Sequence, residues 1–61
     1  MIKARRLEAW LMDWVHQNTE LTMLTVDGEV MAYDGEEAVF SIRELAECLA
    51  VALAEEGLDR A

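Results

Sequence analysis

The topology of the chain is determined by residues 21–40, whose sequence is LTMLTVDGEVMAYDGEEAVF. Two Asp-Gly pairs, Asp27-Gly28 and Asp34-Gly35, each follow a run that is rich in strand-forming residues. An Asp-Gly pair between two apolar runs is a strong signal for a β-hairpin, because both turn positions need a positive φ. The segment therefore predicts an antiparallel meander of three strands, at residues 21–26, 29–33 and 36–40.

An amphipathic helix is predicted before the meander, over residues 2–17. Its apolar residues recur at helical spacing and form one stripe, which consists of Leu7, Trp10, Leu11, Trp14 and Val15. Because both Trp residues lie within the stripe, we expect them in the core. Asn18 comes next, and Asn tolerates the left-handed conformation in which helices commonly end.

A second helix is predicted after the meander. Ser41 is its N-cap, and Glu44, three residues later, completes a capping box. Phe40 and Leu45 occupy the two positions of a hydrophobic staple. Gly57 supplies the C′ residue of a Schellman motif, in which Leu58 folds back onto Leu53. The predicted buried stripe of this helix consists of Ile42, Leu45, Leu49 and Leu53, flanked by Ala46 and Ala52.

These elements predict an α+β fold: a three-stranded antiparallel meander with two helices packed on one face, in the order α-β-β-β-α. With two residues in each turn, strict alternation places six residues on one face: Leu24, Val26, Met31, Tyr33, Ala38 and Phe40. Since Phe40 also belongs to the helix staple, we expect this face to be the core. The opposite face is then an apolar contact surface through Met23, Val30 and Val39, unless the register is shifted by one residue.

Composition and charge narrow the class of function. The 61 residues are enough for a single domain, residues 1–61, and 54% of them are hydrophobic, too many for a disordered acidic tail. The chain has 13 acidic and 5 basic residues, which gives a formal charge of −8. Such a field repels nucleic acids and anionic membranes and attracts basic protein surfaces. We therefore expect a protein partner and neither direct nucleic-acid binding nor membrane binding.

No combination of residues predicts catalysis. His16 is the only histidine, near the end of the first helix, and Cys48 is the only cysteine, at the margin of the second buried stripe, where a packed hydrophobe is expected. One His and one Cys do not make a metal site. A lone Cys fits a reducing compartment, and no signal segment is present, so a cytoplasmic location is expected. We expect no enzymatic activity, cofactor or metal.

Seven carboxylates are the predicted partner-binding residues. One group lies at the turns and on the third strand, and consists of Glu29, Asp34, Glu36 and Glu37. The other group lies within about 80° on the outer side of the second helix and consists of Glu44, Glu47 and Glu55. A rigid set of carboxylates can occupy a groove that normally binds phosphates, although a merely solvated surface would carry similar charge.

In size, charge and compactness the whole chain resembles small acidic inhibitors encoded by phages, notably anti-CRISPR proteins and other DNA mimics. These proteins share no diagnostic motif, so no residue role is transferred. The resemblance implies a basic protein or nucleoprotein complex as the target, such as a CRISPR effector in a bacterial host, whose DNA-binding surface the carboxylates would block. Two alternatives stay open: an antitoxin or regulator that neutralises a basic protein, and a homodimeric structural interaction module.

Overall fold

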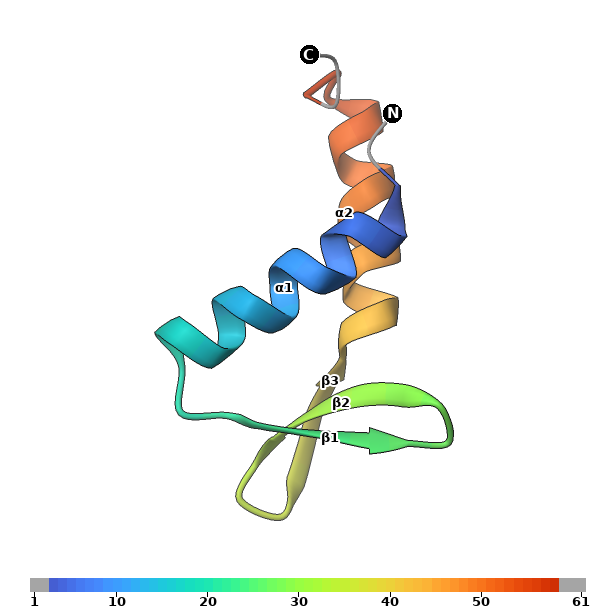
Figure 1. The fold of residues 1–61 in the computed structure, drawn as a ribbon. Helices are drawn as coiled ribbons and strands as arrows, with labels where there is room; N and C mark the ends of the chain where they lie inside the picture. The colour runs from blue at the N-terminus through green and yellow to red at the C-terminus, as the bar shows by residue number, and fades with distance from the viewer. Residues whose placement is uncertain (1–2, 59–61) are drawn as a thin grey trace.

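The computed structural model describes residues 3–58 and has the predicted order α-β-β-β-α, so the α+β fold class is confirmed. The elements are α1 (Ala4–Asn18), β1 (Thr22–Val26), β2 (Glu29–Asp34), β3 (Glu37–Ser41) and α2 (Ile42–Glu55). The strands form one antiparallel sheet in the order β1-β2-β3. Both helices lie above this sheet in Figure 1, where α1 crosses α2 and α2 continues directly from β3.

The first hairpin turn is the predicted one. Asp27 and Gly28 both have positive φ, 51° and 79°, and Val26 pairs with Glu29 across them. The second turn lies one residue later than predicted. Asp34 pairs with Glu37, so the turn residues are Gly35 and Glu36, and β3 is shifted accordingly.

A β-bulge in β3 makes the predicted core face wrong. Tyr33 pairs with Ala38, but Ala32 pairs with Phe40, so Val39 is an extra residue on β3. The bulge moves Phe40 to the face of Ala32, which is fully buried. The face that packs against the helices therefore consists of Met23, Val30, Ala32 and Phe40.

The residues expected in the core on the opposite face are more open to solvent. Leu24 is 52% exposed and Val26 is 41% exposed. Of the predicted apolar contact residues, Met23 and Val30 are half-buried against the core, and only Val39 is exposed. The contact surface expected from Met23, Val30 and Val39 is therefore wrong for the first two, because helices cover that face.

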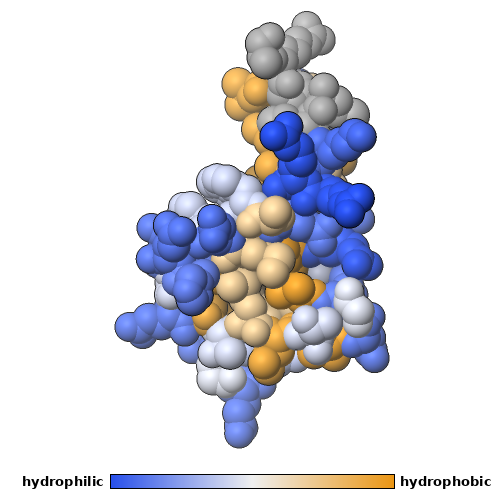
Figure 2. All heavy atoms as spheres, in the orientation of Figure 1, coloured by the Kyte–Doolittle hydropathy of each residue, from blue (hydrophilic) through white to orange (hydrophobic). Residues whose placement is uncertain are grey.

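The core lies mainly where the two helices cross. Its buried residues are Leu11 and Val15 from α1 and Ile42 and Ala46 from α2. α1 packs chiefly on α2, and α2 packs on β2 and β3. The core is small, so apolar residues also reach the surface. Figure 2 shows them in the middle of the view, between groups of hydrophilic side chains.

The prediction that both Trp residues are buried is wrong. Trp10 and Trp14 each precede a buried residue of α1 by one position, which turns them about 100° away from the contact with α2. Trp10 is 56% exposed and Trp14 is 46% exposed. The apolar stripe of α1 is therefore wider than the surface that the rest of the chain offers to cover it.

Both ends of α2 lie where the sequence predicts them, but the capping box is only half formed, because within residues 3–58 the Glu44 side chain makes no hydrogen bond back to Ser41. Ser41 caps the helix, because its Oγ accepts a hydrogen bond of 3.3 Å from the backbone N–H of Glu44. At the other end Gly57 has a φ of 70°, and the N–H of Leu58 donates to the carbonyl of Leu53 at 2.9 Å. With the N–H of Gly57 donating to the carbonyl of Ala54 at 3.1 Å, this bond makes a Schellman motif. Leu58 itself is 69% exposed.

α1 ends differently from the prediction. Asn18 is the last helical residue and is not left-handed, and its side chain donates to the carbonyl of Trp14 at 3.0 Å. Thr19 instead provides the C-cap, because both its N–H and its Oγ1 donate to the carbonyl of Val15, at 3.0 and 2.7 Å. Two donors therefore satisfy one carbonyl at the end of the helix.

Candidate functional site

The structure divides the seven predicted carboxylates among three places. Glu29 begins β2. The hairpin cluster, at the β2–β3 turn, consists of Asp34, Glu36 and Glu37. The helix cluster, on α2, consists of Glu44, Glu47 and Glu55. In Figure 1 the β2–β3 turn lies at the bottom and α2 rises toward the top, so the two clusters belong to different parts of the fold.

Glu29 has a partner inside the molecule. Its Oε1 accepts a hydrogen bond of 2.8 Å from Ser41 Oγ, and the Glu29 residue is half-buried. Because Ser41 is the N-cap of α2, this carboxylate lies near the positive end of the helix dipole, where a negative charge is favourable. Glu29 therefore stabilises the junction of the sheet with α2, a role that its position after the Asp-Gly turn did not reveal.

The hairpin cluster concentrates negative charge on a two-residue turn. Asp34 and Glu37 are directly opposite one another on neighbouring strands, and Glu36 lies in the turn between them. All three are exposed. Like charges directly opposite one another in a sheet are destabilising, so this arrangement has a cost in folding stability.

The nearest base in the sequence does not neutralise either cluster. Arg43 Nε lies 3.8 Å from Glu8 Oε1, and Arg43 Nη2 donates to the carbonyl of Gly28 at 3.3 Å. The contact between Arg43 and Glu8 is the only ion pair within residues 3–58. The Arg43 side chain therefore joins α2 to α1 and to the first turn, and the clustered carboxylates have no basic partner among the described residues.

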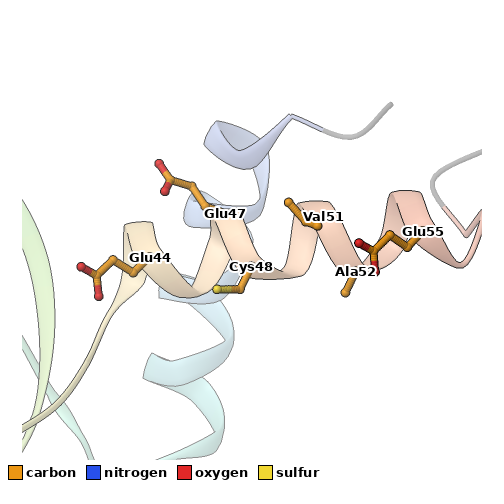
Figure 3. A pocket seen from close by; sticks show the side chains of 6 residues that line it. All are labelled: Glu44, Glu47, Cys48, Val51, Ala52 and Glu55. Carbon is orange, nitrogen blue, oxygen red and sulfur yellow. The ribbon is translucent and has the colours of Figure 1, made fainter.

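The helix cluster borders an apolar strip on the outer side of α2. Figure 3 shows Glu44, Glu47 and Glu55 along the helix. Between them lie Cys48, Val51 and Ala52. Together these residues line a shallow depression of about 600 Å³. Because a single helix provides the lining, the depression cannot enclose a small molecule and is better suited to contact with another macromolecule.

The predicted packing of Cys48 is wrong, because its side chain is exposed. The buried arc of α2 centres on Ile42, Ala46 and Leu49, and Cys48 lies outside it. Val51, which no sequence argument singled out, is 57% exposed beside it. A clear signal was available, since Val51 falls on the same side of the helix as the three glutamates.

Metal binding and membrane insertion are two further functions on which the described residues bear. Within residues 3–58, no group of three or more His, Cys, Asp and Glu side chains is placed to hold a metal ion. In the same part of the chain neither helix has the length and apolar character needed to cross a bilayer. His16 is exposed in the last turn of α1.

No protein family, curated protein or solved structure matches this chain. The function is therefore inferred from the chemistry of the surfaces themselves.

Proposed function

We propose that this chain is a non-enzymatic binding protein that covers the basic, nucleic-acid-binding surface of another protein with its carboxylates. The observation that supports this most directly is the hairpin cluster. Asp34 and Glu37 face one another across the strands, Glu36 adds a third charge in the turn, and Arg43 is engaged elsewhere. A cationic partner would convert this repulsion into attraction.

The spacing of the charges suits a surface that binds phosphates. Directly opposite residues in an antiparallel pair have Cβ atoms about 5 Å apart, and residues three apart on a helix are separated by about 5–6 Å. Each strand of DNA carries one charge per roughly 3.4 Å of helix axis, a spacing of the same order. Lys and Arg side chains arranged for a nucleic-acid backbone can therefore match the pair Asp34 and Glu37 in the hairpin cluster and the pair Glu44 and Glu47 in the helix cluster.

The more specific form of the proposal is a stoichiometric inhibitor of a nucleoprotein complex, such as a CRISPR effector in the bacterial cytoplasm. Its binding is salt-dependent, because the attraction between exposed charges is screened by ions. The chain itself does not bind DNA, since its charge of −8 opposes contact with phosphates.

The test is displacement of DNA-binding proteins. A bacterial lysate is loaded on immobilised DNA, the chain is added, and the released proteins are measured at low and high salt. We expect the wild-type chain to release a basic protein at low salt. The triple variant Asp34→Asn, Glu36→Gln, Glu37→Gln should not do so.

The matched control neutralises three exposed carboxylates outside both clusters, through Asp13→Asn, Asp27→Asn and Glu56→Gln. It changes the net charge by the same amount and should retain displacement. Equal loss in both variants would mean that total charge and not the hairpin cluster is responsible. Full displacement by the hairpin variant, or a gel shift of DNA by the chain alone, would contradict the proposal.

A further inference from the structure

A further surface lies on α1, outside both carboxylate clusters. Trp10 and Trp14 are one helical turn apart on one side of the helix, with Leu7 half-buried beside them. We call these three residues the Trp face. Together with Lys3 and Gln17 they follow the alternating spacing of four and three residues by which two helices pack along a seam. Large aromatic residues exposed together are typical of contact surfaces and not of solvated ones.

The accessible surface of the chain is larger than that expected for a folded monomer of its mass. The accessible surface is 4837 Å². A folded monomer of 6.9 kDa is expected to expose about 4000 Å². The excess of about 800 Å² equals what one partner buries in an interface of standard size.

The shape agrees with this excess. The radius of gyration is 12.3 Å, and a compact domain of 61 residues is expected to have about 10.5 Å. α1 contributes to the elongation because it packs on α2 and only weakly on the sheet. One side of α1 is therefore without cover from the rest of its own chain.

The charges of α1 favour a second copy of this chain in antiparallel orientation. Lys3, Arg5 and Arg6 lie at the start of the helix, where positive charge is unfavourable for the helix dipole. The first turn has no acidic residue to offset them. Glu20 follows the other end, two residues after the last helical residue, Asn18. Two antiparallel copies of α1 bring each basic start beside the acidic, partially negative end of the other.

We propose that the Trp face is the contact between two copies of this chain, related by a twofold axis that crosses α1 between Trp10 and Trp14. In this arrangement Trp10 of one protomer packs against the partner's Trp14, and the reverse contact forms by symmetry, as in an isologous interface. The proposal is independent of the function proposed above, because the interface contains neither the hairpin cluster nor the helix cluster.

Two measurements on the wild-type chain test the proposal without any substitution. Sedimentation equilibrium over micromolar to millimolar concentrations should give twice the chain mass of 6.9 kDa at the upper end. The two Trp residues are the only ones in the chain. Over the same concentrations their fluorescence should therefore shift to shorter wavelength and become less accessible to iodide, because association removes the indole rings from water.

The substitution test uses matched pairs of exposed apolar residues. Trp10→Gln with Trp14→Gln should weaken self-association by roughly thirtyfold or more, as expected for central aromatic anchors. Leu24→Gln with Val39→Gln changes two similarly exposed residues, 52% and 53%, on the sheet and should leave association unchanged. The hairpin variant tested for displacement should also associate like the wild type, so failure of one proposal is separable from failure of the other.

Three results would overturn the Trp-face dimer. One is a single-chain mass at every concentration. Another is a doubled mass with no change in Trp fluorescence, which would place the contact elsewhere. The third is loss of association in the sheet variant but not in the Trp variant. If circular dichroism shows that the Trp variant is unfolded, the fluorescence of the wild-type chain still decides the question.

Discussion

Ser41 Oγ donates a hydrogen bond of 2.8 Å to Glu29 Oε1, and this bond connects the start of β2 to the N-cap of α2. The same oxygen accepts the backbone N–H of Glu44. Ser41 is only 4% exposed, so its hydroxyl joins two elements in a place that water hardly reaches. The capping residue thus links local helix formation to the packing of helix on sheet.

Replacement of this hydroxyl should therefore be costly. Ser41→Ala removes the cap and leaves Glu29 without its partner, and we expect a loss of about 1–2 kcal/mol in the free energy of unfolding. Urea denaturation followed by circular dichroism measures the loss. A double-mutant cycle with Glu29→Ala should give a coupling energy of about 0.5 kcal/mol or more. Additive effects would show that the hydrogen bond contributes nothing of its own.

The first turn should depend on backbone conformation alone. Gly28 has a φ of 79°, and a Cβ built there meets no atom within 4 Å. Gly28→Ala should reduce the free energy of unfolding by about 1–2 kcal/mol, through the cost of a left-handed conformation for an L-residue. Gly28→Asn should cost less, because Asn tolerates that conformation. Equal losses for Ala and Asn in a denaturant titration would contradict this explanation.

The helix crossing should reject a larger side chain. Ala46 of α2 is fully buried where α2 packs on α1, whereas Ala52 is exposed on the outer side of the same helix. Ala46→Leu should destabilise the chain by about 1–3 kcal/mol through overpacking, and Ala52→Leu should change stability by less than about 0.5 kcal/mol. Thermal unfolding of both variants compares the same substitution in one helix. A stable Ala46→Leu variant would mean that the helices are not in close contact.

In the hairpin cluster, stability and binding should respond in opposite directions. Glu37→Lys places a positive charge opposite Asp34 and should stabilise the chain by about 0.2–1 kcal/mol. The same change should weaken displacement of proteins from DNA, because the partner loses a carboxylate. Melting temperatures at low and high salt measure the first effect, and the gain should shrink at high salt. A variant that is both stabler and fully active would separate the cluster from function.

Some features of the fold could be predicted from the sequence because their causes are local. The Asp27-Gly28 turn, the Ser41 cap and the Gly57 ending each depend on residues within a few positions, and the structure confirms all three. The core face could not be predicted in the same way. It depends on the bulge at Val39, where one extra residue reverses the alternation of side chains between the two faces of the sheet. The sequence of β3 contains no local signal that predicts this bulge.

The exposure of Trp10 and Trp14 is a second feature that the sequence does not predict. Their spacing correctly places them beside Leu11 and Val15, but periodicity does not say how much of an apolar stripe another element will cover. For the candidate site, the identities of the carboxylates follow from the sequence. Their division into two clusters, the engagement of Glu29 with Ser41 and the pairing of Arg43 with Glu8 do not, because each depends on how distant segments meet.

The strand order β1-β2-β3 has a consequence for how this chain would misassemble. Both outer strands have an open edge, but they are protected unequally. β3 has a bulge and begins at a carboxylate, and both features discourage the addition of a further strand. β1, with the sequence TMLTV, has neither a charge nor a proline, so a fibril formed on heating would begin from this edge.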